Sequence, residues 1–396
     1  MMPPLSLYVH FPWCVRKCPY CDFNSHELRS AVPEQDYIAA LLRDIEFDRP
    51  RVRDREIISV FFGGGTPSLF SGEAVAALLD GIHGRLNPGT SVEITLEANP
   101  GTTEAGRFHA YRAAGINRIS IGVQSFDDRQ LKKLGRIHSA AQAQQALQMA
   151  KEAGLDNINL DLMFGLPGQG VEEALRDLET AVALNPAHIS WYQLTLEPNT
   201  YFYKHPPALP DDAQLWEMQR RGQALLAAHG FRQYEVSAYA RPGYQCRHNL
   251  NYWQFGDYLG VGAGAHGKLT EPGDFCIVRR ARHRIPQTYL DAAGTPAAVT
   301  RQWRLRREDM ILEFMMNALR LCGGFETSLF EQHTGLALES VREPLEKAAA
   351  RGLLEWTAEK VKPTEQGMRF LNDLLELFLI PQTVDPDQVC YSVNHE

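Results

Sequence analysis

The sequence predicts an α/β fold: a full or partial (β/α) barrel followed by a smaller helical, winged-helix-like domain. Over the first 240 residues, short and nearly all-apolar runs alternate with amphipathic helical segments. That alternation is typical of parallel strands buried on both faces and joined by crossover helices. In addition, polar or glycine-rich groups follow six of the apolar runs. Functional groups of a (β/α) barrel lie at the carboxyl ends of its strands, so the two observations agree.

The individual elements follow from the period of the apolar residues. We expect strands at residues 5–10, 57–62, 92–96, 118–123, 158–164 and 188–194, and a seventh near 234–239. Helices are expected between them at residues 34–47, 72–86, 105–114, 140–153, 171–184 and 213–229. In the first helix Tyr37, Leu41 and Ile45 recur every four residues, as on one helix face. Gly115 and Gly154 stand where two of the helices should end.

The composition changes after residue 240. An aromatic and polar stretch is followed by residues 260–267, which are too rich in glycine for a helix or a regular strand. A later helical pattern is interrupted at Gly323 and Gly324, and a short strand pair at 353–361 precedes a final helix. We therefore divide the chain into a barrel domain, a linker region, a helical C-terminal domain and a tail: residues 1–240, 241–305, 306–380 and 381–396.

Composition limits the classes of protein to be considered. The chain has 396 residues and a formal charge of −8, which argues against nonspecific nucleic-acid binding. No apolar run is long enough for a transmembrane helix. The first residues show neither a basic region nor a cleavable apolar run, so we expect a cytoplasmic protein. Seven cysteines, three of them in one short segment, indicate a metal site in a reducing compartment rather than a disulfide framework.

The three crowded cysteines are Cys14, Cys18 and Cys21, in a CxxxCxxC spacing. Three thiolates can hold three irons of a [4Fe–4S] cluster and leave the fourth iron open for chemistry. The alternative is a Cys3His zinc site with His10 or His26 as the fourth ligand.

Further polar groups stand at the expected strand ends. Consecutive glycines at 63–65 let a ligand approach the backbone, although they would also suit a tight turn. Asp161 lies inside an apolar strand, where a carboxylate needs a partner. With Glu97, Gln124 and Arg136 it forms either a ligand site or an internal salt-bridge network.

The cysteine spacing resembles the signature of radical S-adenosylmethionine (SAM) proteins. With Tyr8-Val-His-Phe-Pro-Trp-Cys14, GGGTPS, Glu97-Ala-Asn-Pro, Gly122-Val-Gln-Ser and the segment 160–169, the chain resembles the oxygen-independent coproporphyrinogen III oxidase group over most of its length. The resemblance implies a [4Fe–4S] cluster on the three cysteines. It also implies a SAM site lined by Tyr8, Tyr20, Gly64, Gly65, Thr66, Glu97, Gln124, Arg136 and Asp161.

Two departures point to one branch of that group. The oxidases carry a fourth cysteine where this chain has Phe23, and a long segment before the cysteines where this chain has 13 residues. Both features resemble the HemW branch of heme chaperones, as does the HNxxYW motif of residues 248–253. This resemblance implies that His248, Tyr252 and Trp253 bind heme.

From residue types alone the motif has a different interpretation. His248 would satisfy a loop hydrogen bond, and the two aromatic residues would belong to the core. Cys246 and His266 are alternative iron ligands. Arginines at 279, 280 and 282 would either pair with heme propionates or form a solvated face.

The resemblance implies a heme chaperone that gives heme to acceptor hemoproteins of the respiratory chain, some of them membrane enzymes. No residue is then assigned a catalytic role, and SAM cleavage is absent or incidental. A homodimer formed around the cluster would suit such a chaperone, although the sequence leaves the oligomeric state open. The alternatives are a coproporphyrinogen III oxidase, which decarboxylates a porphyrinogen by radical chemistry, and a radical SAM enzyme for another tetrapyrrole or small molecule.

Overall fold

A computed structural model describes residues 2–101, 106–271 and 275–379. Its centre is a twelve-stranded sheet with the strand order β14-β13-β12-β11-β1-β4-β5-β6-β7-β8-β10-β9. The six central strands are parallel neighbours in chain order, as expected of consecutive βα units. They are β1 (Leu5–Phe11), β4 (Glu56–Gly64), β5 (Asn87–Ala98), β6 (Arg118–Gln124), β7 (Asn157–Phe164) and β8 (His188–Gln193). The predicted α/β partial barrel is confirmed.

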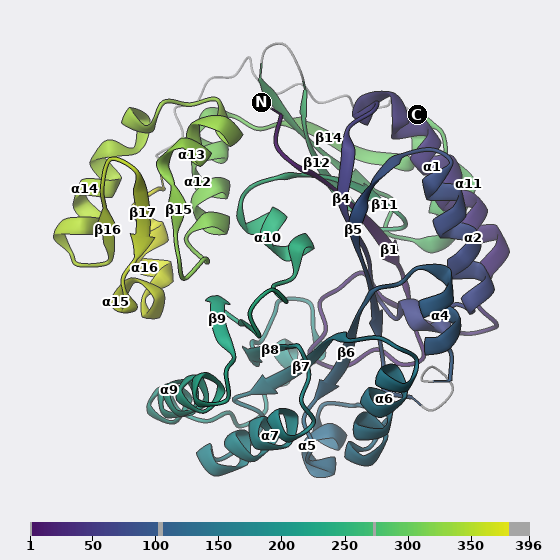
Figure 1. The fold of residues 1–396 in the computed structure, drawn as a ribbon, viewed down its shortest axis with the longest axis horizontal. Helices are drawn as coiled ribbons and strands as arrows, with labels where there is room; N and C mark the ends of the chain where they lie inside the picture. Colours follow the sequence, from purple (N-terminus) through teal and green to yellow (C-terminus); the bar gives the residue numbers. More distant parts are fainter. Residues whose placement is uncertain (1, 102–105, 272–274, 380–396) are drawn as a thin grey trace.

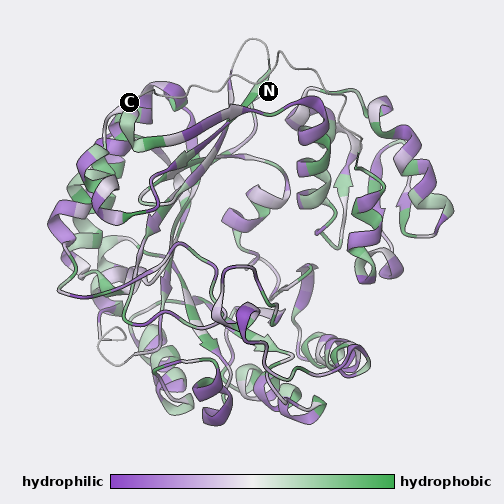
Figure 2. Cartoon of the chain, turned by 180° about the vertical axis from the view of Figure 1, so that it is seen from behind, coloured by the Kyte–Doolittle hydropathy of each residue, from purple (hydrophilic) through white to green (hydrophobic). Residues whose placement is uncertain are grey.

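Helices cover the outer side of this sheet, and Figure 1 shows the sheet curving as an open arc with α1, α2, α6 and α7 outside it. The helices of this part are α1 (Glu34–Val52), α2 (Gly72–His83), α4 (Phe108–Ala114), α5 (Asp128–Lys133), α6 (Ala140–Glu152), α7 (Val171–Ala183), α8 (Tyr201–Lys204) and α9 (Asp212–Ala228). Figure 2 shows that they carry both hydrophilic and hydrophobic residues, as amphipathic helices do. The predicted start of one helix at 105 lies outside the described residues.

Strand structure is present near residues 234–239, as expected, but it does not continue the parallel series. The chain there forms two short strands, β9 (Arg232–Glu235) and β10 (Ala238–Ala240). β10 pairs antiparallel with β8 and with β9. Helix α9 leads from β8 to β9, but a short turn then joins β9 to β10, and antiparallel β10 takes the place beside β8, so the parallel series ends there.

The expected linker at 241–305 is also corrected, because these residues complete the main sheet. They form α10 (Arg247–Trp253), β11 (Asp257–Val261), β12 (His266–Glu271), β13 (Cys276–Arg282), α11 (Pro286–Ala292) and β14 (Val299–Arg304). β11 pairs in parallel with β1, and the following strands are antiparallel. Gly260 does lie in a strand: a Cβ there would come within 1.9 Å of the His266 carbonyl oxygen, so the glycine permits close strand approach.

The C-terminal part has an apolar core of its own, with Phe314, Phe330 and Leu345 buried in it. It contains α12 (Arg307–Ala318), α13 (Thr327–Thr334), α14 (Arg342–Ala350), α15 (Glu365–Arg369) and α16 (Leu371–Glu376), with a three-stranded sheet of β15 (Phe325–Glu326), β17 (Lys360–Pro363) and β16 (Leu354–Trp356). Helices with a small antiparallel sheet match the predicted winged-helix-like domain. The expected tail from 381 lies outside the described residues. Within the described part, no helix combines the length and apolar character needed to cross a bilayer.

Candidate functional site

The three clustered cysteines lie on a loop held at the end of β1. A two-stranded parallel sheet, β2 (Trp13–Cys14) and β3 (His26–Glu27), closes the loop at its base. Inside it, Lys17 Nζ donates to the carbonyl oxygens of Phe23 and Ser25 at 3.2 Å. All three thiols line one cavity of about 280 Å³. Burial raises the pKa of the Cys14 and Cys21 thiols, so metal binding must displace their protons.

The glycine segment after β4 forms one wall of this cavity. Gly64 has a φ of +113°, a conformation open to glycine, and its N–H donates to Glu97 Oε2 at 3.2 Å. Gly65 N donates to the Phe11 carbonyl at 2.6 Å, and a Cβ on Gly65 would lie 2.5 Å from the Trp13 carbonyl oxygen. The glycines therefore join the end of β4 closely to β1 while their backbone lines the cavity.

A chain of hydrogen bonds connects Cys14 with Cys18 through three side chains that line the cavity. Thr66 Oγ1 donates to Cys14 Sγ at 3.4 Å and accepts from Asn99 Nδ2 at 2.9 Å. Asn99 Oδ1 accepts from Arg136 Nη2 at 2.6 Å, and Arg136 Nη1 donates to Cys18 Sγ at 3.6 Å. The Arg136 guanidinium thus stands within the cavity, close to a predicted cluster ligand, where it can pair with an anionic group.

Two partly buried carboxyl groups, of Glu97 and Asp161, also line the cavity. Glu97 has its pKa raised to about 8, first by burial and then by the nearby Asp161 carboxyl. Burial also raises the pKa of Asp161, although Ser120 and Asn159 donate to it at 2.8 Å. Such a pair favours a bound cation or hydroxyl groups, because either would satisfy the ionised form.

Gln124 marks the end of β6 with strained backbone. Its φ is +70°, which a residue with a side chain rarely adopts, and such strain gathers at binding sites. Its Oε1 accepts from the Tyr192 hydroxyl at 2.9 Å. Tyr192 lies on β8 and lines the same cavity. Neither Tyr192 nor Asn99 was predicted from the sequence, although Asn99 stands in the Glu-Ala-Asn-Pro segment.

The structure brings most of the predicted site together. The first cavity is lined by Cys14, Cys18, Cys21, Tyr20, Gly64, Gly65, Thr66, Glu97, Gln124, Arg136 and Asp161. Tyr8 lines a neighbouring cavity of about 600 Å³ instead, together with Tyr252 and His266. The two cavities share Phe23, Gly64 and Glu97, and are therefore adjacent. Phe23 is 58% exposed and stands where the two meet.

The histidines considered for a zinc site are engaged elsewhere. His10 Nε2 lies 2.8 Å from the Asn24 carbonyl, and its Nδ1 lies 3.0 Å from the Tyr8 hydroxyl. His26 Nε2 lies 3.0 Å from the Arg284 carbonyl. Both rings hold the cysteine loop in place, so these contacts favour a site made of the three thiols alone.

His248 lies under the inner face of the sheet, at 2% exposure. Its Nδ1 lies 2.9 Å from Ser59 Oγ, its ring stacks on Phe61 at 4.9 Å between centroids, and its backbone N–H donates to Glu93. Its Nε2 is buried, with no hydrogen-bond partner among the described residues. Burial and the Arg118 cation lower the pKa of His248 to about 3, so the ring is neutral.

The other aromatic residues of the HNxxYW motif lie in different surroundings. Tyr252 packs against His248 at 5.0 Å and reaches the second cavity, whereas the Trp253 ring lies 4.3 Å from the Arg320 guanidinium carbon, beside the C-terminal part. Cys246 is fully buried with its thiol 3.5 Å from Glu93 Oε1, and its pKa is raised to about 12, chiefly by burial.

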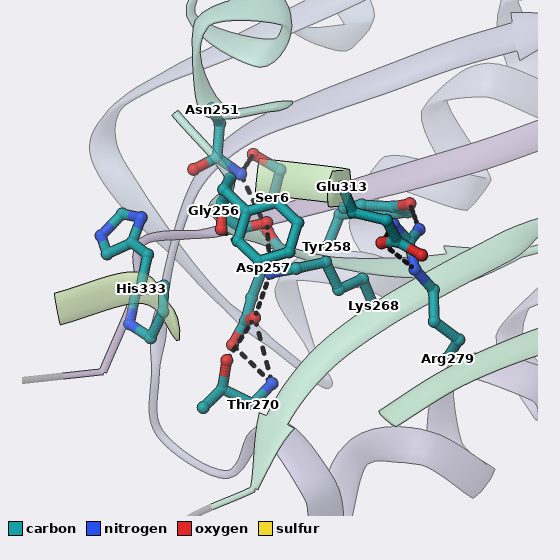
Figure 3. Close-up of polar contacts among 12 residues, drawn as sticks. Ser6, Asn251, Gly256, Asp257, Tyr258, Lys268, Thr270, Arg279, Glu313 and His333 are labelled. Carbon is teal, nitrogen blue, oxygen red and sulfur yellow. Dashed lines mark hydrogen bonds and ion pairs between the residues drawn. The ribbon is translucent and has the colours of Figure 1, made fainter. Parts of the chain in front are cut away.

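The three arginines proposed for propionates are occupied by protein carboxylates. Arg279 pairs with Glu313 and the Tyr258 hydroxyl on the inner face of the sheet, as Figure 3 shows. Arg282 pairs with Asp44 and Asp48 of α1 at 2.9 and 2.6 Å, and Arg280 also pairs with Asp48. The solvated-face alternative is wrong as well, because Arg282 is 2% exposed.

Comparisons with known proteins agree with this architecture. The model of the radical SAM superfamily matches residues 8–181, and that of the HemN C-terminal domain matches residues 305–370. Radical SAM proteins use a [4Fe–4S] cluster and SAM, so the match implies both cofactors. In the solved structures, coproporphyrinogen III oxidase (HemN) from Escherichia coli shares the fold, with a TM-score of 0.80, 24% identity, and coverage of 95% of this chain and 90% of that one.

Relatives of known name cover almost the whole chain. Heme chaperone HemW of Escherichia coli is 52% identical over 96% of this chain and 99% of its own. Heme chaperone HemW of Bacillus subtilis is 34% identical over 94% and 99%. The mouse mitochondrial radical S-adenosyl methionine domain-containing protein 1 is 37% identical over 95% and 87%. With its two matching domains and its HemN-like fold, the chain belongs to the HemW family of the radical SAM superfamily.

Proposed function

We propose that this protein is a heme chaperone, which binds heme and delivers it to acceptor hemoproteins. The observation that carries the proposal is the second cavity, of about 600 Å³, beside the thiol-lined one. It presents tyrosine rings and two histidines, and a site for a flat apolar macrocycle with an iron centre needs such groups. The names of the HemW relatives support the same conclusion.

The first cavity would hold the cofactors that the superfamily implies. Cys14, Cys18 and Cys21 would bind a [4Fe–4S] cluster, which supplies an open iron when bound. Arg136 can pair with the SAM carboxylate, and Glu97 and Asp161 can accept from its ammonium and hydroxyl groups. The remaining residues of the proposed SAM site are Tyr20, Gly64, Gly65, Thr66 and Gln124. Tyr8 would act on the far side of Glu97, where it lines the second cavity.

The acceptors would be hemoproteins of the respiratory chain, and the chaperone would meet them in the cytoplasm, at the membrane surface where the acceptor is a membrane enzyme. A homodimer formed around the cluster would suit heme transfer. The competing function is decarboxylation of coproporphyrinogen III, which the shared fold and the SAM-type cavity also accommodate.

An anaerobic heme titration of the cluster-reconstituted protein, followed by absorption, tests the proposal. Coproporphyrinogen III and SAM are assayed for turnover in a parallel sample. We expect saturable heme binding and no turnover, followed by heme transfer to an apo-hemoprotein. Turnover with consumption of SAM would overturn the chaperone in favour of the oxidase, and absence of heme binding at micromolar concentration would also overturn it.

A further inference from the structure

The second cavity contains one histidine that is available to a metal. His266, at the start of β12, is exposed and lines the cavity, and no hydrogen bond to its ring occurs within the described part of the chain. His10 lines the same cavity, but both of its ring nitrogens are engaged. Partial desolvation of the ring in the cavity, followed by nearby arginines, lowers the pKa of His266, which favours the neutral imidazole that binds iron.

Three arginines stand near His266, and two of them have no carboxylate partner among the described residues. The arginines that lower its pKa are Arg279, Arg284 and Arg301. Arg279 is paired with Glu313. No ion pair with a carboxylate is found for Arg284 or Arg301 among the described residues. Arg284 lines the cavity, and its backbone carbonyl accepts from Asn24 and His26 of the cysteine loop at 2.9 and 3.0 Å.

The sheet register places Arg301 on the same face as His266. His266 is the partner of Ala281, which is the partner of Arg301 on the next strand. Directly paired residues of antiparallel strands point to one face, and the small side chain of Ala281 leaves room between the two larger ones. Arg279 lies two residues before Ala281 and shares this inner face, while Arg280 and Arg282 point to α1 on the other.

His248, unlike His266, lies behind the wall of the second cavity. It contacts Tyr8 and Tyr252, which line the cavity, at 6.3 and 5.0 Å between ring centroids, and it does not line the cavity itself. A ligand in the cavity would reach its Nε2 after these rings had moved apart. His248 is thus positioned to support the tyrosine wall from behind.

We propose, resting on the proposed chaperone function, that His266 is the protein ligand of the heme iron in this cavity. Arg284 and Arg301 pair with the two propionates, Phe23 and Tyr252 contact the macrocycle, and His248 is a positioning residue for the wall. Iron ligation by an imidazole and pairing of guanidinium groups with carboxylates are the interactions that heme requires.

Replacement of the ligand tests the assignment directly. His266→Cys should bind ferric heme with the absorption and EPR signature of thiolate ligation, and His266→Ala should raise the Kd for heme at least tenfold. His248→Gln should retain the wild-type ligand signature. His229, exposed at the C-cap of α9, is the control position, and His229→Ala should match the wild type. Each variant must retain SAM binding and cluster iron, which shows that the fold is intact.

Heme dimethyl ester tests separately whether Arg284 and Arg301 pair with the propionates. Heme dimethyl ester lacks the two carboxylates, so Arg284→Ala and Arg301→Ala should weaken heme binding severalfold and leave binding of the ester unchanged. The inference is wrong if His266→Cys keeps the wild-type signature while His248→Gln loses it. In that case the wild type still binds heme and the chaperone function stands; if the wild type binds no heme, the proposed function itself fails.

Discussion

His248 Nδ1 lies 2.9 Å from Ser59 Oγ, and this contact fastens α10 to β4. Ser59 Oγ also lies 2.7 Å from Ser6 Oγ, which accepts from Asn251 Nδ2 at 2.9 Å. The histidine and the asparagine at 251 therefore both anchor the helix to adjacent strands. A motif that the family resemblance assigns to heme has, in this structure, a packing role that is visible residue by residue.

This role predicts a loss of stability. His248→Ala removes a buried ring and leaves Ser59 without one of its partners, so we expect a decrease of about 2–4 kcal/mol in the free energy of unfolding. His248→Gln, which can keep a hydrogen bond to Ser59, should lose less. Guanidinium denaturation of the heme-free protein measures both. Equal stability of the alanine variant and the wild type would contradict the anchoring role.

The arginines of β13 give a second prediction. Arg282→Gln leaves Asp44 and Asp48 buried without their main cation, and breaking a buried pair in this way costs about 3–5 kcal/mol. Arg49→Ala removes an exposed pair with Glu46 and should change stability by about 0–1 kcal/mol. Thermal or chemical unfolding compares the two. If Arg282→Gln were as stable as Arg49→Ala and instead lost heme affinity, the propionate role expected from the sequence would be restored.

The local sequence of β13 explains why its arginines were assigned wrongly. The parallel strands were predictable because strands buried on both faces, such as Ile57–Phe62 within β4, consist mainly of apolar residues. β13 has the sequence CIVRRAR, and its arginines are explained only by partners far away: Asp44 is 238 residues from Arg282 in the chain. The local sequence pattern of β13 therefore suggested a linker, whereas ion pairs with residues distant in the sequence stabilise a strand there.

The residues of the candidate site also differ in how far they could be predicted from the sequence. Residues at the ends of parallel strands meet at one edge of the sheet whatever the loops do, and the thiols, Gly64 and Glu97 accordingly line one cavity. Asp161 lies inside β7 and was assigned to that site only through the family resemblance. The second cavity is different. His266 and Arg301 are brought together by the register of three antiparallel strands, which the sequence does not reveal.

The thiol cavity predicts a third result. Cys18→Ser should reduce iron after anaerobic reconstitution from about four atoms per chain to well below one, because two thiolates and a hydroxyl hold a [4Fe–4S] cluster poorly. Cys322→Ser is the matched control, since Cys322 is half-buried and lines a separate cavity by the C-terminal part. Iron and sulfide analysis with absorption spectra gives the readout. Full iron content in Cys18→Ser would exclude Cys18 as a ligand.

Glu97 predicts a pH dependence with a defined sign. Its pKa in the ligand-free fold is about 8, above its ordinary value of 4.5, so the folded state binds this proton more tightly than the unfolded chain does. Its contribution to stability is therefore fully present below about pH 4.5 and is lost as the pH rises to about 8. Glu97→Gln should remove this dependence, so that its unfolding free energy exceeds that of the wild type increasingly toward pH 8.

The same group should couple SAM binding to proton release. Positive charge on the ligand favours the ionised carboxylate, so SAM binding at pH 7 should expel the proton of Glu97, and affinity should rise with pH until about 8. Calorimetry in two buffers of different ionisation enthalpy counts the protons. The amine of the ligand can release a proton too. The number of protons released by the wild type minus the number released by Glu97→Gln therefore gives the contribution of Glu97 alone.

Asp177 is a control, because it is a buried carboxyl with a pKa of about 6 that accepts hydrogen bonds from Ser125 and Phe126 instead of lining the cavity. Asp177→Asn should release as many protons as the wild type, and equal release by Glu97→Gln would show that Glu97 does not contact the bound cation.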